Sequence, residues 1–270
     1  MPSAVADPHV RLDGVRMAFG TREVFRRLDC AFPRGRISCI LGTSGSGKST
    51  ILRLVGGLIH PQAGHVFVDG EDVTQLGHRA LFELRKKIGM MFQGGALLDS
   101  ETVFDNLAFP LREHTHARRA EIATRVRQTL AAVGLHGVDD LLPSQLSGGM
   151  MRRVALARAL IMRPVICLCD EPFSGLDPVS VRLIERLFQR VNAENRITMI
   201  VVSHDVRSTY RIADHVVLIV PGGEAIQGTP DELRAHPDPR VRAFLTDEVD
   251  AAAIEAAEHA AEREASGGAT

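Results

Sequence analysis

The sequence lacks any apolar run long enough to cross a bilayer. Stretches such as residues 165–169 and 216–220 fall far short of the roughly 20 apolar residues that a membrane helix needs. The first residues, MPSAVADPHVRLDG, also lack the basic start and apolar segment of a secretory signal. We therefore expect a cytoplasmic chain that does not itself span a membrane.

Neither acidic nor basic residues are in excess. The chain has 32 basic and 33 acidic residues, a formal net charge of -1 and no long basic run. A protein that binds nucleic acid usually carries a basic surface to neutralise phosphates. The composition therefore predicts no nucleic acid partner.

Cysteine is scarce and carries no metal or redox pattern. The four cysteines include no CxxC pair, the spacing typical of zinc and dithiol sites. Cys167 and Cys169 alternate within an apolar stretch, so both point to one face of a strand. We expect them to pack as small hydrophobic residues.

The order of predicted elements indicates an α/β fold. Short apolar segments with turn signals fill residues 10–68, with one helix placed after Thr50, while residues 96–159 are rich in helical patterns. The stretch RRAEIATRVRQTLAAVGL repeats apolar residues at helical spacing. Afterwards ICLCD and ITMIVVSHD resemble buried strands, separated by a helix over 181–192. A parallel sheet that carries an all-helical lobe explains this order.

A phosphate-binding loop follows the apolar residues 37–41. The sequence GTSGSGKS fits the G-x-x-x-x-G-K-[ST] pattern, and a helical stretch comes directly after it. Glycines let backbone N–H groups and a helix N-terminus face phosphate oxygens. The side chain of Lys48 suits the β- and γ-phosphates, and the hydroxyl of Ser49 suits Mg²⁺. The predicted ATP-binding residues are Gly42, Thr43, Ser44, Gly45, Ser46, Gly47, Lys48, Ser49 and Thr50.

Two carboxylates end the apolar strand predicted over 165–169. They are Asp170 and Glu171, and the carboxyl end of a buried strand is where α/β sheets bind ligands. Asp170 suits the Mg²⁺ shell, and Glu171 suits a general base for an attacking water. An Asp-Glu pair alone is usually a solvated corner, but here it accompanies a phosphate-binding loop.

A second glycine loop, LSGGM, opens the helical stretch MRRVALARAL at the far end of the predicted insert. It cannot serve the same nucleotide from the side that the first loop occupies, so one chain would hold half a site. With CDEPFSGLDP and VVSHD, these segments resemble the ATP-binding-cassette (ABC) ATPases. The resemblance implies that two copies face each other head to tail, with Ser147, Gly148 and Gly149 binding the phosphate held by the other copy. Met150 stands where most family members have Gln.

The resemblance covers residues 8–245, which we expect to form one ABC ATPase domain with a helical subdomain over 96–159. It implies that Phe19 stacks on adenine and that Gln93 reaches Mg²⁺ and the attacking water. It further implies that Asp177 touches the opposite copy and that His204 contacts the γ-phosphate. The alternatives are a core phenylalanine at position 19 and a structural histidine at position 204.

The stretch GMMFQGGALLDSETVFDNLAFPLREHT resembles the ATPase subunit of bacterial Mla-type phospholipid transporters. That resemblance implies a membrane permease, an MCE lipid-binding protein and a place on the cytoplasmic face of the inner membrane. Ala96, Leu97 and Leu98 would form an apolar lip for a permease helix. Alternatively, these residues simply pack the helical insert.

The last residues, 246–270, are rich in Ala and Glu but hold few large apolar side chains. Such a tail is a marginal helix by itself or a disordered segment. The resemblance to the Mla-type family implies a contact with the second copy and a small accessory subunit.

Other classes of function remain open. The chain could be an ABC ATPase for another cargo or a soluble assembly ATPase built on the same domain. A small-molecule kinase would also use the first loop, but it leaves LSGGM and His204 without a role.

Overall fold

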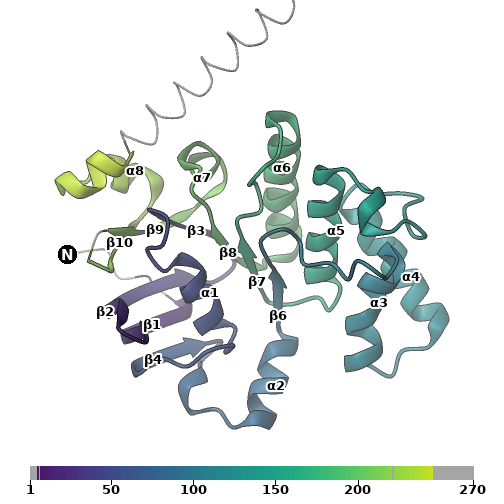
Figure 1. Cartoon of the computed structure of the whole chain (residues 1–270), viewed down its shortest axis with the longest axis horizontal. Coiled ribbons are helices and arrows are strands. Elements are labelled where there is room, and N and C mark those ends of the chain that lie inside the picture. Colours follow the sequence, from purple (N-terminus) through teal and green to yellow (C-terminus); the bar gives the residue numbers. More distant parts are fainter. Residues whose placement is uncertain (1–4, 6, 221, 246–270) are drawn as a thin grey trace, which may run out of the picture.

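The computed structural model describes residues 5, 7–220 and 222–245. Within this part of the chain the strands form two sheets that lie on either side of helix α1 (Figure 1). The predicted tail over 246–270 lies outside the described residues. No helix among those described is both long and apolar enough to traverse a bilayer.

The larger sheet has six strands in the order β10-β9-β3-β8-β7-β6. All neighbouring pairs are parallel except β9 and β10. The strand bounds are β3 Ile37–Gly42, β6 Ile88–Met91, β7 Ile166–Asp170, β8 Thr198–Val202, β9 His215–Val220 and β10 Glu224–Gly228. Every residue of β3, β7, β8 and β9 is buried. Burial on both faces explains the continuous apolar runs in the sequence.

A second, antiparallel sheet has the order β2-β1-β4-β5. Its strands are β1 Pro8–Phe19, β2 Arg22–Pro33, β4 Ala63–Val68 and β5 Glu71–Asp72. The sequence predicted short strands in this region but only one parallel sheet. The difference arises because β1 and β2 are joined by a tight turn, which allows only antiparallel pairing.

Helix α1, Lys48–Val55, packs between the two sheets. Its residues Ile51, Leu52 and Val55 are fully buried in a core shared with both sheets, for example with Leu12 of β1 and Ile40 of β3. This packing fixes the N-terminus of α1 at the carboxyl edge of β3, where the phosphate-binding loop lies.

Three helices follow β6 and precede β7 along the chain, in the region predicted to be helical. They are α3 Val103–His114, α4 Arg119–Ala132 and α5 Gly148–Leu160, and they stand together on one side of the molecule (Figure 1). Helix α4 buries Ile122, Val126 and Leu130, as its helical repeat predicted. The remaining helices are α2 His78–Lys86, α6 Pro178–Asn195, α7 Val206–Ile212 and α8 Pro230–Arg234, with 3₁₀ turns at Val73–Gln75 and Pro143–Gln145.

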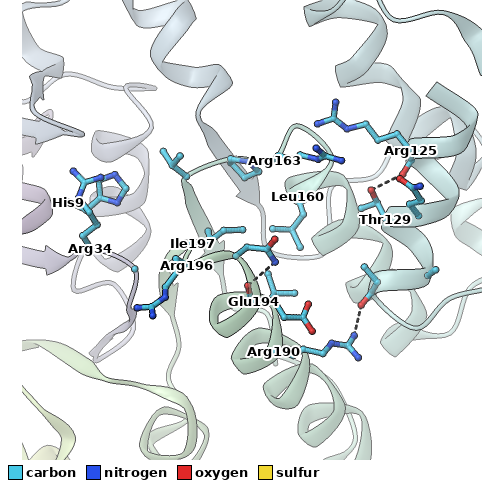
Figure 2. A pocket seen from close by; sticks show the side chains of 18 of the residues that line it. His9, Arg34, Arg125, Thr129, Leu160, Arg163, Arg190, Glu194, Arg196 and Ile197 are labelled. Atoms are coloured by element: carbon cyan, nitrogen blue, oxygen red, sulfur yellow. Dashed lines mark hydrogen bonds between the residues drawn. The ribbon is translucent and has the colours of Figure 1, made fainter. Parts of the chain in front are cut away.

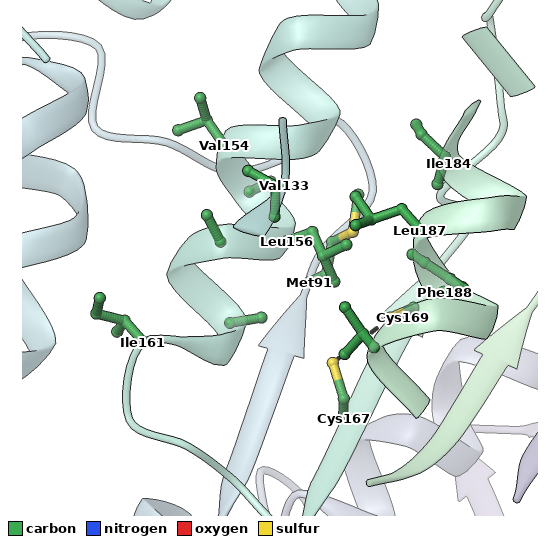
Figure 3. Close-up of a cluster of buried hydrophobic side chains, with 14 of the residues drawn as sticks. Met91, Val133, Val154, Leu156, Ile161, Cys167, Cys169, Ile184, Leu187 and Phe188 are labelled. Carbon is green, nitrogen blue, oxygen red and sulfur yellow. Dashed lines mark hydrogen bonds between the residues drawn. The ribbon is translucent and has the colours of Figure 1, made fainter. Parts of the chain in front are cut away.

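The cysteines pack as small hydrophobic residues, as predicted. Cys167 and Cys169 face one way from β7 into a cluster with Leu187 and Phe188 of α6 (Figure 3). Their sulfur atoms are 3.7 Å apart. The hydrogen bond with Cys167 and burial raise the pKa of the Cys169 thiol, which keeps it protonated and unreactive.

Candidate active site

The phosphate-binding loop connects β3 to α1 at the carboxyl edge of the larger sheet. Its backbone needs glycine at two positions. Gly42 has φ +148°, and a Cβ there would lie 2.8 Å from the carbonyl oxygen of Ile219. Gly47 has φ +99°, and a Cβ there would lie 2.5 Å from Cζ of Phe25. The close approach of these neighbours therefore fixes the shape of the loop.

Lys48 is the first residue of α1, and only 8% of its surface is exposed. Its ammonium group donates hydrogen bonds to the carbonyl oxygens of Gly42 at 2.7 Å and Thr43 at 3.0 Å. The positive charge is thereby held inside the loop, beside the N-terminus of α1. Charge and helix dipole have the same sign here, and both favour an anion.

Ser49 in the first turn of α1 and Asp170 at the end of β7 bring two oxygen ligands together. The Ser49 hydroxyl donates a hydrogen bond of 2.9 Å to Oδ1 of Asp170. Burial raises the pKa of the Asp170 carboxyl, and the Ser49 bond opposes that rise. A hydroxyl and a partly desolvated carboxylate are ligands that Mg²⁺ prefers, so the residues present fit this cation.

Glu171 and His204 also meet at this edge. Nδ1 of His204 and Oε2 of Glu171 are 2.8 Å apart. Glu171 has φ +49°, an uncommon conformation for a residue with a side chain, and its backbone N–H donates to the Val202 carbonyl at 3.0 Å. Strained backbone of this kind clusters at functional sites.

A cleft of about 500 Å³ runs along these residues. Its lining residues are Phe19, Arg22, Val24, Ser44, Gly45, Gly47, Lys48, Ser49, Thr50, Gln93, Glu171, Ser174 and His204. Six of the nine loop residues predicted to bind ATP are therefore on one surface with Phe19, Gln93, Glu171 and His204. Phe19 keeps 47% of its surface exposed, so it is not the core phenylalanine of the alternative interpretation.

The second glycine loop does not reach this cleft. Ser147 caps α5, accepting a hydrogen bond of 3.3 Å from the Met150 N–H, and the helix begins at Gly148. Neither Ser147 nor Gly148 or Gly149 lines the cleft. Within a single chain, the two glycine loops are thus separate, as the half-site interpretation requires.

Asp177 likewise lies outside the cleft. It caps α6, because its Oδ1 accepts hydrogen bonds of 3.0 Å from the N–H groups of Val179 and Ser180. The hydrogen bonds from Ser180 lower the pKa of the Asp177 carboxyl. Its predicted contact with a second copy is not tested by these bonds, which give it a structural role in any case.

Two arginines of α5 connect the elements of the site, and sequence reasoning missed both. Arg152 donates a hydrogen bond of 3.0 Å to the carbonyl oxygen of Ser174, close behind Glu171. Arg158 donates to the carbonyl oxygens of Gly95 at 3.0 Å and Ala96 at 2.9 Å, just after Gln93. On a helix such residues are typical of a solvent-facing side, so no sequence pattern predicted these bonds.

Arg22 was also missed. Its guanidinium lines the cleft and donates a hydrogen bond of 3.1 Å to the Gly45 carbonyl. The available signal was its position three residues after Phe19, across the turn that joins β1 and β2.

The predicted apolar lip is partly formed. Ala96 is exposed and Leu98 is 43% exposed, whereas Leu97 packs against the core of the helical region. Both interpretations of this stretch therefore apply to different residues of it.

The parallel sheet, the glycine loop at its carboxyl edge and the paired carboxylates define a P-loop NTPase. A family model described as "ABC transporter" matches residues 25–174. The chain therefore belongs to the ABC transporter family, and it is the ATPase component of such a transporter.

Relatives match over most of the chain. It is 45% identical to the intermembrane phospholipid transport system ATP-binding protein MlaF of Haemophilus influenzae, covering 86% of this chain and 88% of that protein. It is 43% identical to MlaF of Escherichia coli K12, covering 87% and 88%. Among solved structures, the dimeric ATP-binding cassette MJ0796 bound to ADP and Pi has a TM-score of 0.74 and 30% identity, covering 82% and 98%.

Proposed function

We propose that this chain is the ATP-hydrolysing subunit of a phospholipid transporter and that it works as a dimer with a membrane permease. The observation that supports phospholipid as the cargo is the similarity to two MlaF proteins over nearly the whole ATPase region. The dimeric cassette among its structural relatives supports the assembly.

The cleft residues suggest the division of roles. The loop backbone and Lys48 bind the β- and γ-phosphates, and the exposed ring of Phe19 stacks on adenine. Ser49, Asp170 and Gln93 would hold Mg²⁺, which supplies charge neutralisation at the phosphates when bound. Glu171 takes a proton from the attacking water, and His204 orients that carboxylate through their hydrogen bond and contacts the γ-phosphate.

The site is completed by a second copy. Ser147, Gly148 and Gly149 stand at the start of a 13-residue helix that lies outside their own cleft. The free N–H groups of that first turn and the helix dipole favour a phosphate. In a head-to-tail dimer they face the γ-phosphate held by the partner, beside a contact made by Asp177.

Coupling to the permease runs through residues 96–159, which we propose as a helical subdomain within an ABC ATPase domain over 8–245. The bonds from Arg158 to Gly95 and Ala96 join the loop after Gln93 to the helix that begins with the second glycine loop. Movement of either loop on closure would then move the exposed Leu98 surface on which a permease helix sits.

The remaining partners follow from the same relationship. An MCE lipid-binding protein and a small accessory subunit would complete the transporter, with this chain on the cytoplasmic face of the inner membrane. The contact predicted between the tail, 246–270, and the accessory subunit lies outside the described residues and stays a prediction.

The test is co-purification followed by a lipid transfer assay. A tagged full-length chain should bring a multi-span permease from detergent-solubilised membranes. In vesicles of defined phospholipids, the complex should move labelled phospholipid only with Mg-ATP, and the same complex with Glu171→Gln should not. A chain that stays soluble with ATP and never binds a membrane partner, or a complex that moves another cargo, would refute the proposal.

A further inference from the structure

A large crevice opens at the opposite edge of the parallel sheet from the ATP cleft. It has a volume of about 900 Å³ and lies where β3, β7 and β8 begin, next to α4 and the end of α6 (Figure 2). None of its lining residues belongs to the phosphate-binding loop or the second glycine loop. Its size is within the range of small-molecule sites.

The crevice is lined mainly by cationic side chains. Its charged residues are Arg34, Arg125, Arg163, Arg190 and Arg196 against only Asp7 and Glu194. His9 also lines it, but burial lowers the pKa of that imidazole, so His9 adds no charge at neutral pH. The arginines come from both the β-sheet region and the helical region, and in Figure 2 they surround the opening from several sides.

Among the described residues, three of these arginines have neither a carboxylate partner nor a hydrogen bond from the guanidinium group. Arg34 pairs with Asp7 and Asp69, and Arg190 donates to the Ala132 carbonyl. In contrast, within the described part of the chain no ion pair or hydrogen bond engages the guanidinium groups of Arg125, Arg163 or Arg196.

Arg125 and Arg163 stand close enough to repel each other. Burial lowers the pKa of the Arg125 guanidinium, and the charge of Arg163 lowers it further. The Nε atom of Arg125 is buried without a hydrogen-bond partner. A buried donor without an acceptor costs free energy, as do two like charges. An anion bound in the crevice beside these groups would offset the repulsion between the two charges.

The turns that present two of the arginines are themselves unfavourable for a residue with a Cβ. Arg163 has φ +53° and Arg196 has φ +54°, a conformation in which glycine is more stable. Both turns follow helix ends, where a cation is favoured by the dipole. Two such ends contribute about one negative charge together, which leaves the crevice positive.

We propose that this crevice binds a soluble anion that carries at least two phosphate groups. The planar forks of arginine match phosphate oxygens in pairs, and guanidinium groups from several elements suit a ligand with more than one anionic group. Since Arg125 belongs to α4 and Arg34 and Arg196 belong to the sheet region, the ligand bridges the helical region and the sheet region far from the ATP cleft.

The test uses inorganic pyrophosphate and the full-length chain with Lys48→Ala, which removes the phosphate affinity of the ATP cleft. In calorimetric titrations, pyrophosphate should bind this chain, more weakly as salt rises. Adding Arg125→Gln or Arg163→Gly should weaken binding by at least about tenfold. Arg27→Gln should have no effect, because Arg27 is exposed and pairs with Asp29 away from the crevice.

The thermal unfolding midpoint of each variant serves as the control for correct folding. Arg163→Gly relieves the left-handed backbone, so this variant should be at least as stable as its parent while losing the anion.

A second experiment measures binding of the protein to vesicles of phosphatidylglycerol and to vesicles of phosphatidylcholine. Arg125-dependent binding to the first vesicles alone would assign the phosphate to a lipid headgroup and overturn a soluble ligand. No pyrophosphate binding, or equal binding by both crevice variants and the parent, would overturn the site.

Discussion

The hydroxyl of Ser49 donates a hydrogen bond of 2.9 Å to Oδ1 of Asp170. These residues are 121 positions apart in the chain, and β8 lies between the strands that precede them in the sheet. The bond places the phosphate-binding loop beside the carboxylate of β7 with two hard oxygen atoms in contact. A hydroxyl and a carboxylate are ligands that magnesium prefers, so Ser49 and Asp170 would hold that ion at this point.

Asp170→Asn should strongly reduce magnesium-dependent hydrolysis without weakening the fold. Burial raises the pKa of Asp170, so its charged form is disfavoured in the folded state, and the stability of the metal-free protein falls as pH rises through that pKa. The amide removes this cost. We expect turnover to fall by about 10²-fold or more and the unfolding midpoint at neutral pH not to fall. A magnesium titration and a thermal melt measure both, and a magnesium response like that of the wild type would contradict the role.

Glu171→Gln should separate binding from hydrolysis. The amide keeps the size of the side chain but cannot accept the proton of the attacking water, so turnover should drop by about 10²- to 10⁴-fold. ATP affinity should stay within about twofold, because the change leaves Lys48 and the glycines of the phosphate-binding loop in place. With Mg-ATP the variant should accumulate as a dimer in light scattering. Rapid turnover by the variant would refute the assignment of the base.

Lys48→Ala should remove nucleotide affinity. The ammonium group lies within the loop, 2.7 Å from the Gly42 carbonyl oxygen, and no other lysine lines the cleft. Loss of a buried charge-assisted contact should weaken ATP binding by at least about tenfold. Lys87→Ala is the matched control, since Lys87 is 44% exposed and pairs with Asp69 and Glu71. Fluorescent nucleotide titration measures both, and equal affinity in the two variants would dismiss the role of Lys48.

His215 should make the fold sensitive to acid. Burial lowers its pKa from 6.5 to about 4, so the unfolded chain takes up this proton before the folded chain does. The contribution of His215 is therefore present above pH 6.5 and lost as pH falls toward 4. Between pH 7 and pH 5 the loss is about 2 kcal/mol. Urea unfolding at both values should show a smaller loss for His215→Leu than for the wild type. An equal loss would show that His215 does not titrate in this way.

Local sequence patterns predicted those parts of the site that depend on neighbouring residues. The glycines and Lys48 act within one strand, loop and helix, and the apolar repeat of α4 reports its buried face directly. The start of α6 was placed too late, at 181 instead of Pro178, although Asp177 followed by proline is a strong helix start. That error concerns a boundary and leaves the architecture unchanged.

Contacts between distant segments could not be predicted in the same way. The meeting of Glu171 and His204 depends on β7 and β8 being neighbours, and strand order is not encoded in any single strand. The bonds of Arg152 and Arg158 depend on how α5 lies against two loops. Their sequence context is that of ordinary surface arginines, so only the packing of the helix assigns them a role.

The most direct test of the composite site mixes two inactive variants. One carries Lys48→Ala, and the other carries Gly148→Asp. The aspartate suits the first turn of α5 but repels a phosphate. If each site uses the loop of one copy and the second glycine loop of the other, a mixed dimer contains one intact site, and the mixture should hydrolyse ATP at least several-fold faster than either variant alone. If the mixture stays as inactive as its components while both are folded and dimerise, each chain uses its own two loops and the composite site is wrong.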